Sequence, residues 1–326
     1  MRRRDFVSLL GSAAVAWPFA ARAQQSKGPA RLGFVPLGSP SNSYDRSLIE
    51  AFQRGLRDVG LIDNRDVVLD VVWPGNDPDQ AVSEVLRRGV DVLIPCGTSA
   101  SVAAKRQTST IPIMFLSVGD PVGMGLVESL SHPGHNTTGF SDILGELSGK
   151  LVDVATELIK PQTTVGYLWQ TTWQDGQNRY QATEKAAQVA GLKLRSKGIA
   201  DIAELDSALM AMKQSGSTAL IVQPGPLTYL NRERIIASTM KNGMGTIFGP
   251  PVAAREGSLI AYGPDYVQMY RRSSLYVGRI LKGTKPSDLP VERPSKIEFL
   301  INLQTAKTLG IEVPLSLLVR ADELLE

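Results

Sequence analysis

Residues 90–127 read VDVLIPCGTSASVAAKRQTSTIPIMFLSVGDPVGMGLV and contain two apolar runs, each followed by a polar loop. The first run, residues 90–95, precedes an alanine-rich helical segment that begins at Thr98. The second run, residues 111–118, ends at Gly119-Asp120-Pro121. This order predicts two parallel strands joined by a helix, because parallel neighbours need a crossover connection. The two polar loops then lie together at the carboxyl edge of one sheet, where open α/β sheets bind their ligands.

Further strand and helix units precede and follow this stretch. We predict strands over 31–36, 67–73, 137–140, 164–169, 192–196, 219–223, 246–249 and 259–262, mostly with helices between them. A chain of 326 residues also fits two domains of ordinary size. The sequence therefore predicts an α/β protein of two lobes, each a parallel sheet flanked by helices, with a ligand cleft between the lobes.

The last part of the chain is too short to form a third domain with a core of its own. We expect a long amphipathic helix over 266–281 to pack on the first lobe and the tail to pack on the second. The predicted first lobe is then 31–143 plus about 263–285. The predicted second lobe is 144–262 plus about 286–326. We also expect a helix over 124–130 and a terminal helix over 314–326.

The composition is that of an ordinary globular protein, with 43% hydrophobic and 21% charged residues. The net charge of +3 comes from 35 basic and 32 acidic residues that are scattered along the chain, so nucleic-acid binding is not indicated. The single cysteine, Cys96, excludes an internal disulfide and a multi-cysteine metal site. We interpret it as a small buried apolar residue, since a nucleophilic cysteine needs a histidine partner.

Residues 1–23 have the features of an export signal: three arginines, a short apolar run and the small residues Ala21 and Ala23 before Gln24. Arg3-Arg4-Asp5-Phe6-Val7 fits the twin-arginine pattern, and a general secretory signal is the alternative. No cysteine follows the cleavage site, so a lipid anchor is not expected. These features predict a mature protein in the periplasm of a bacterium.

Polar residues at the strand ends of the first lobe are candidate ligand contacts. Ser39 and Ser41 lie in a loop before a helix, and Thr98 and Ser99 begin the helix after a strand. Free N–H groups and hydroxyls at a helix N-terminus suit an anion, although the same residue types also serve as ordinary caps. Asp120-Pro121 is placed either to accept hydrogen bonds from an amine or to cap the segment that follows.

The second lobe offers candidates at the ends of its own strands. They are Trp169, Thr171, Thr172, Pro224, Gly225, Phe248, Tyr262 and Asp265. Aromatic residues at strand ends are more often core residues than ligand contacts. Trp169 and Phe248 nevertheless fall where the cleft would be lined. We expect a ligand carboxylate at Thr98 and Ser99, an amine at Asp120 or Asp265, and an apolar body against the two aromatic rings.

The sequence contains no nucleophile–histidine pair, G-x-S-x-G, H-E-x-x-H or P-loop motif. His132 and His135 could supply half of a metal site. His-Pro-Gly-His is, however, a typical turn sequence, and no cluster of carboxylates accompanies it. We therefore expect no catalytic residue, no metal and no cofactor.

Seven short motifs occur in this order along the chain: Phe52-Gln53-Arg54-Gly55-Leu56-Arg57, Thr110-Ile111-Pro112-Ile113, Gly119-Asp120-Pro121-Val122-Gly123, Asn136-Thr137-Thr138-Gly139, Glu146-Leu147-Ser148-Gly149-Lys150, Tyr262-Gly263-Pro264-Asp265 and Ile301-Asn302-Leu303-Gln304-Thr305-Ala306-Lys307. Together they resemble the motifs of ABC-transporter substrate-binding proteins of the tryptophan/tyrosine-transport type. The resemblance implies a type I periplasmic-binding fold and a ligand in the cleft between its lobes. It also implies delivery to an inner-membrane ABC permease. Characterised members bind aromatic amino acids.

We thus expect a monomeric periplasmic receptor that closes on a small molecule, an aromatic amino acid or a related small carboxylate. A ligand-sensing module is one alternative. A periplasmic hydrolase with Asp120 or Asp265 as general base is another, although the missing motifs argue against it. A sugar-type repressor of the same fold would carry a DNA-binding segment where this chain has its export signal.

Overall fold

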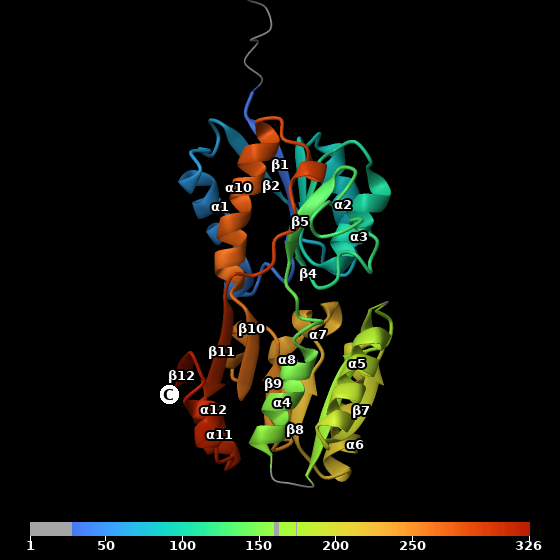
Figure 1. Cartoon of the computed structure of the whole chain (residues 1–326), viewed down its shortest axis with the longest axis vertical. Coiled ribbons are helices and arrows are strands. Elements are labelled where there is room, and N and C mark those ends of the chain that lie inside the picture. The colour runs from blue at the N-terminus through green and yellow to red at the C-terminus, as the bar shows by residue number, and fades with distance from the viewer. Residues whose placement is uncertain (1–27, 160–162, 174) are drawn as a thin grey trace, which may run out of the picture.

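The computed structural model describes residues 28–159, 163–173 and 175–326. The predicted export signal lies outside these residues. Two α/β lobes are stacked along the long axis of the molecule (Figure 1). Within the part of the chain that the structure describes, no helix is both long and apolar enough to cross a membrane.

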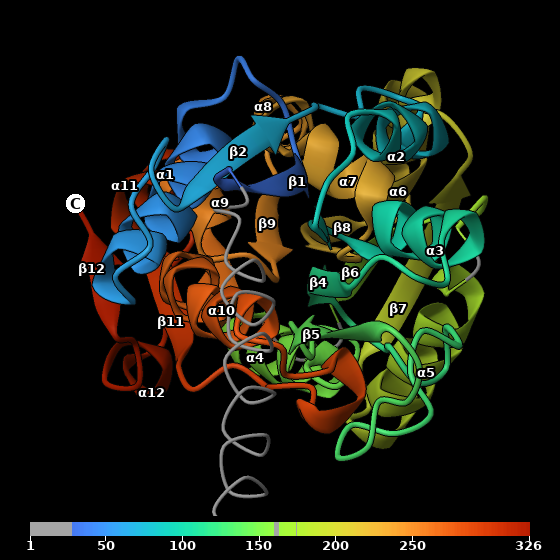
Figure 2. The same cartoon turned by 90° about the horizontal axis from the view of Figure 1, so that it is seen from above.

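The first lobe is built on a five-stranded sheet in the order β2-β1-β3-β4-β5, with every neighbouring pair parallel. Its strands are β1 (Ala30–Val35), β2 (Val67–Val71), β3 (Val92–Pro95), β4 (Ile113–Val118) and β5 (Thr137–Ser141). Its helices are α1 (Ser43–Asp58), α2 (Pro78–Arg87) and α3 (Thr98–Gln107), joined by α10 (Tyr266–Leu281) from late in the chain. Helices α1 and α10 cover one side of the sheet, and α2 and α3 cover the other (Figure 2).

Apolar side chains project from both faces of this sheet, so helices cover both faces. Leu32 and Phe34 of β1 lie in the core under α1 and α10, whereas Val35 lies in the core under α2 and α3. Strands buried on both faces are continuously apolar, as β3 and β4 are. Helix α1 buries one apolar stripe that includes Leu48 and Phe52, and the long helix α10 packs against it.

The second lobe has a seven-stranded sheet in the order β12-β11-β10-β9-β8-β6-β7. Its strands are β6 (Thr164–Gln170), β7 (Lys193–Ile199), β8 (Ser217–Val222), β9 (Gly245–Phe248), β10 (Ile260–Pro264), β11 (Ile297–Asn302) and β12 (Glu323–Leu325). Its helices are α4 (Ser148–Leu158), α5 (Gly176–Val189), α6 (Leu205–Gln214), α7 (Pro226–Leu230), α8 (Arg232–Lys241), α9 (Val252–Arg255), α11 (Leu303–Leu309) and α12 (Leu315–Leu318). All neighbouring pairs are parallel except β10 and β11.

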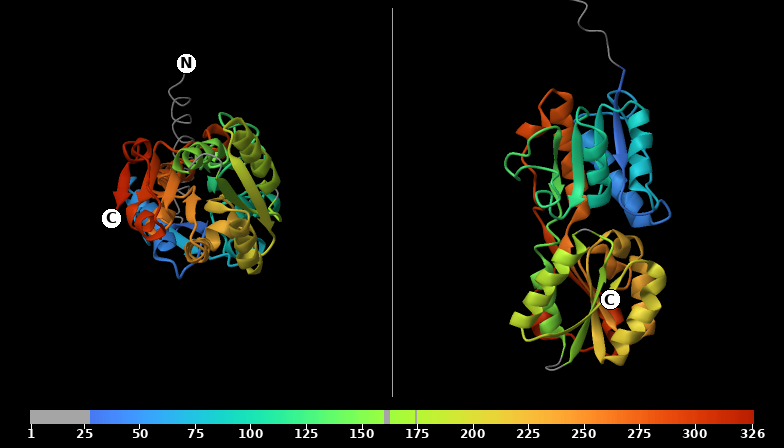
Figure 3. Two further views of the ribbon diagram at one scale, coloured as in Figure 1. Left: turned by 90° about the horizontal axis from the view of Figure 1, so that it is seen from below. Right: turned by 90° about the vertical axis from the view of Figure 1, so that its right-hand side faces the viewer.

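The chain passes between the lobes after β5, after β10 and again before β11. These connecting segments lie together on one side of the molecule (Figure 3). The backbone N–H of Ser141 donates to the carbonyl of Glu292 at 2.9 Å, and that of Asp265 donates to the carbonyl of Lys296 at 3.2 Å. The segments therefore brace one another and leave the carboxyl edges of the two sheets facing each other. The lobe boundaries given above stay a prediction.

Two predicted helices are wrong. Residues 124–130 form turns, because Gly125 has φ of +65° and the Lys105 Nζ atom donates to the carbonyls of Gly125 and Leu126, which a helix would use internally. The terminal segment forms only the short helix α12. It then continues as β12, since pairing with β11 satisfies the backbone of the last residues.

Candidate ligand-binding cleft

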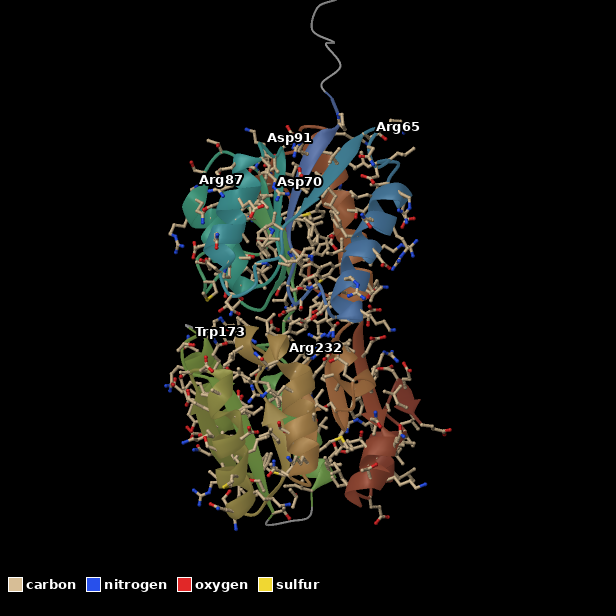
Figure 4. All side chains as sticks on the ribbon, turned by 180° about the vertical axis from the view of Figure 1, so that it is seen from behind. Arg65, Asp70, Arg87, Asp91, Trp173 and Arg232 are labelled. Carbon is tan, nitrogen blue, oxygen red and sulfur yellow. The ribbon has the colours of Figure 1, made fainter. Side chains whose placement is uncertain are left out.

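A cavity of about 90 Å³ lies between the lobes, several times the space that one water molecule needs. Its first-lobe wall is formed by loops at the carboxyl ends of β1, β2, β3 and β4. Its second-lobe wall comes from the loops after β6, β8 and β9, with part of α5 and α7. This is the edge at which parallel sheets bind ligands, and it is supplied by both lobes. Side chains from both lobes converge on this junction, where Figure 4 labels Trp173 and Arg232.

Most of the cavity wall is apolar. Leu37 lies on the first lobe, Leu144 on the first connection, and Trp173 and Phe248 on the second lobe. Six prolines complete this wall: Pro36, Pro74, Pro78, Pro224, Pro226 and Pro250. Prolines have no N–H group that would need a partner and have a fixed φ, so they form a rigid apolar surface. The cavity is therefore suited to the apolar body of a small organic molecule.

The N-terminus of α3 supplies the polar end of the first-lobe wall. Thr98, Ser99 and Ala100, the first three residues of this helix, all line the cavity. The residue before them, Gly97, has no side chain to cap the helix, and its φ of +81° favours glycine. The first N–H groups of a helix are not used by the helix itself and carry its partial positive charge. An anion is the natural partner of this end of the cavity.

Arg179 of α5 brings a buried positive charge to the opposite wall. Its side chain is 6% exposed and its Nε atom donates to Asp175, while the guanidinium lies 4.7 Å from the centre of the Trp173 ring. Among the described residues, no hydrogen bond from its two terminal nitrogens is present. Gly119 of the first lobe lies against one of them. The positive charge is thus held by the second lobe and presented to the first.

Asp142 lies on the connection that follows β5 and is almost completely buried in the cavity wall. Its Oδ1 atom accepts a hydrogen bond from the Leu144 N–H at 3.1 Å, and Oδ2 accepts one from the Tyr266 hydroxyl at 3.2 Å. Burial raises the pKa of Asp142, and the nearby Arg179 opposes this rise. A cationic group in the cavity would stabilise the ionised carboxylate.

Five residues proposed from the sequence line this cavity: Thr98, Ser99, Pro224, Gly225 and Phe248. The structure therefore brings together the helix start, the Pro-Gly strand end and one of the two proposed rings. Whether these residues contact a ligand stays a prediction.

Several of the other proposed residues have local partners elsewhere. The carboxylate of Asp120 is exposed and accepts a hydrogen bond from the Gly123 N–H at 2.8 Å. Asp265 caps α10 by accepting from the Gln268 N–H at 2.9 Å. The rings of Trp169 and Tyr180 are stacked, with centroids 5.1 Å apart.

The remaining proposed residues also lie outside the cavity lining. Ser39 and Ser41 bond to each other at 2.8 Å, and Pro121 is buried in the turn after β4. Thr171 and Thr172 are exposed, and the ring of Tyr262 packs against Phe299. These local contacts explain the positions of the side chains without a ligand.

Sequence reasoning missed the polar groups at the centre of the cavity. Asp142 follows β5 at the same sheet edge as Asp120 follows β4, so the signal that pointed to Asp120 applies equally to it. Tyr229 lies in the short helix α7, and Arg179 lies in the first turn of α5. Nothing local in the sequence distinguishes either residue from an exposed helical one.

Comparison with known proteins places this architecture among solute receptors. A family model for "ABC transporter substrate binding protein" matches residues 42–325. A tyrosine-binding protein of Clostridioides difficile is 25% identical over 278 residues, which is 81% of this chain and 76% of the relative.

Solved structures agree with this match. A conserved domain protein of Vibrio cholerae has a TM-score of 0.82 and 24% identity, covering 90% of this chain and 99% of that one. A domain from Streptococcus pneumonia, in complex with L-Trp, has a TM-score of 0.82 and 22% identity over 91% of this chain and 100% of that one. A ligand-free, open substrate-binding protein of Clostridium difficile has a TM-score of 0.65 and 23% identity, covering 88% of this chain and 96% of that one. The predicted two-lobed type I fold is confirmed.

Proposed function

Because the chain belongs to the ABC transporter substrate binding protein family, we propose that it captures a small molecule in the interlobe cavity and delivers it to an inner-membrane ABC permease. The ligand that we propose is an aromatic amino acid or a related small carboxylate. The observation that carries this proposal is the cavity itself, which is lined by both lobes and combines an apolar wall with an uncapped helix N-terminus.

The positions of the polar groups support a definite orientation of the ligand. A ligand carboxylate would lie at the N-H groups of Thr98 and Ser99, where the end of α3 is positive. An amine would lie at Asp142, since Arg179 pairs with Asp175 through its Nε atom, whereas the Asp142 carboxylate has no ion-pair partner within 4.0 Å among the described residues. This differs from the sequence-based proposal, which gave the amine to Asp120 or Asp265.

The apolar body of the ligand would then lie against Leu37, Trp173 and Phe248. Rings and branched chains bury more apolar area than small polar ligands do, so they gain more from such a wall. The names of the relatives agree with this choice, because one is a tyrosine-binding protein and one was solved with L-Trp.

The remaining parts of the proposal concern the setting of the protein. We infer that residues 1–23 direct export, that the mature protein acts in the periplasm as a monomer, and that it has no enzymatic turnover. A periplasmic sensor module is the second candidate, since it would use the same cavity. The two differ in their partner: a transport receptor increases uptake by a permease, whereas a sensor module acts without one.

Thermal shift of the mature protein tests the ligand class. Residues 24–326 would be screened against the aromatic amino acids, their desamino carboxylates and a set of sugars. A ligand that binds only the folded state raises the melting temperature. We expect the largest shift from an aromatic amino acid or carboxylate. Shifts only with sugars, or with none of these compounds, would contradict the proposed ligand class.

A further inference from the structure

A buried polar contact joins the two lobes beside the ligand cavity. Asp45, in the first turn of α1, is 1% exposed although it is a carboxylate. Its Oδ1 atom accepts hydrogen bonds from the Tyr229 hydroxyl at 3.0 Å and from the Arg232 Nη2 atom at 3.2 Å, both from the second lobe. Arg232 lies where the end of α1 meets that lobe (Figure 4).

The second-lobe half of this contact is complete without the first lobe. The Arg232 Nε and Nη2 atoms donate to the two oxygens of Glu256 at 2.8 and 2.9 Å, and Nη1 donates to the Tyr229 carbonyl at 3.1 Å. The guanidinium also lies 4.5 Å from the centre of the Tyr229 ring. Arg232 is therefore already oriented before Asp45 arrives, so little side-chain entropy is lost when the lobes meet.

The first-lobe half comes from the beginning of α1 and the loop before it. Asn42 caps α1 through its Oδ1 atom, while its Nδ2 atom donates to Glu256 at 3.2 Å and to Glu233 at 2.5 Å. Gly38 lies over Asp45 so closely that a Cβ atom there would come within 2.1 Å of a carboxylate oxygen. Gly38 also lines the ligand cavity, so one loop contacts both the cavity and this polar group.

We propose that Asn42, Asp45, Tyr229, Arg232 and Glu256 form an interlobe clasp that sets how long the closed cavity retains its ligand. This proposal rests on the proposed function, and it adds that the clasp controls the release of the ligand from the same cavity. Tyr229 connects the two, because its ring lines the cavity and its hydroxyl bonds to Asp45. Arg232 and Asp45 act through Tyr229 and through lobe contact, so they are positioning residues and do not line the cavity.

The clasp makes its cross-lobe bonds only when the lobes are together. Opening would return the Asp45 carboxylate to water and leave the Arg232–Glu256 pair intact. The clasp can therefore form whenever the lobes close, with or without a ligand, and it must break before a bound ligand leaves. Its loss should increase the dissociation rate much more than it lowers the association rate.

Stopped-flow fluorescence of the mature protein with L-tryptophan and L-tyrosine as probes tests the clasp. Arg232→Met leaves the Asp45 and Glu256 carboxylates without their cation in the closed form, and we expect dissociation to be about tenfold faster or more. Tyr229→Phe keeps the ring and removes only the hydroxyl, so a smaller increase in the same direction is expected. Arg255→Met is the matched control, since the exposed Arg255–Glu323 pair lies within the second lobe.

Further measurements distinguish loss of the clasp from general destabilisation of the protein and from a wrongly proposed ligand class. Unchanged dissociation rates in both clasp variants, with the melting temperature of the ligand-free protein preserved, would overturn the proposal. If the wild-type protein binds neither probe, the proposed ligand class fails instead. The clasp is then decided by small-angle scattering of the ligand-free proteins. A larger radius of gyration for Arg232→Met than for wild type and for Arg255→Met would support it, and equal radii would overturn it.

Discussion

Arg179 of the second lobe lies so close to Gly119 of the first that a Cβ atom at residue 119 would come within 2.0 Å of the Arg179 Nη2 atom. The Oδ1 atom of Asp142 lies 3.3 Å from the same Cβ position. The absence of a side chain at residue 119 therefore leaves room for the buried guanidinium and the buried carboxylate to approach this glycine from opposite sides of the lobe boundary, without forming an ion pair within 4.0 Å. Residue 119 is thus a point where the two lobes touch and where both buried charges lie close by.

Gly119→Ala should weaken ligand binding because the added methyl group collides with Arg179 when the lobes are together. Overpacking of this kind costs about 1–3 kcal/mol, which corresponds to a roughly 5- to 150-fold loss of affinity. The melting temperature of the ligand-free protein should change little, since the open form avoids the collision. Titration calorimetry checks the affinity. Full affinity with Ala at residue 119 would show that binding does not require this lobe contact.

Asp142→Asn should lower the affinity for amino acids but not the affinity for carboxylates that have no amine. The substitution removes the negative charge that would pair with a ligand ammonium, and an unpaired buried charge costs about 2–5 kcal/mol. Affinity for L-tryptophan should fall strongly, whereas affinity for 3-(indol-3-yl)propanoate, which has no amine, should be retained. Asp120→Asn is the matched control, because that carboxylate is exposed and lies outside the cavity lining. Equal losses for both ligands would remove Asp142 from amine recognition.

The affinity for an amino acid should depend on pH through Asp142. Burial raises the pKa of this carboxyl in the ligand-free cavity, and a bound ammonium would lower it again. Binding is then strongest above the raised pKa and weakens as the pH falls through it, so affinity should decrease as the solution is made more acidic. The desamino analogue should not show this decrease. Calorimetry in two buffers of different ionisation enthalpy would detect the accompanying proton release.

Gly55→Ala tests the packing of α1 against α10. A Cβ atom at residue 55 would lie 2.0 Å from the Arg271 carbonyl oxygen, so the two helices would have to move apart. We expect a loss of about 1–3 kcal/mol in the free energy of unfolding, larger than the gain in helix propensity of about 1 kcal/mol. Gly149→Ala in α4 is the control, because nothing lies within 4 Å of its added Cβ atom. Denaturant unfolding should show a loss for the first variant only.

Export should depend on the arginine pair if the twin-arginine route is used. Changing both Arg3 and Arg4 to Lys should abolish the appearance of mature protein in the periplasm, with a new N-terminus near Gln24 in the wild type. Fractionation followed by N-terminal sequencing measures both. Unchanged periplasmic yield from the double variant would assign export to the general secretory route.

Most of the fold is predictable from the sequence because central strands such as β3 and β4 are buried on both faces. β3 and β4 consist almost wholly of large apolar residues, and the polar loops that follow them fix the ligand edge of the sheet. The polar groups at the centre of the cavity are harder to predict from the sequence. Arg179 packs against Trp173 and against Gly119 and Gly145, and the two glycines belong to distant parts of the chain. The strand-end pattern leads to Asp120, whose carboxylate is satisfied within its own turn, although the same pattern applies to Asp142.

A crystal structure of the mature protein with its best ligand from the thermal-shift screen tests the central claim most directly. We predict ligand density between the lobes, with its carboxylate at the N–H groups of Thr98 and Ser99 and its apolar body against Trp173 and Phe248. If the ligand carries an amine, that group should lie within hydrogen-bond distance of Asp142. Density at any other place, with this cavity empty at saturating ligand, would contradict the account.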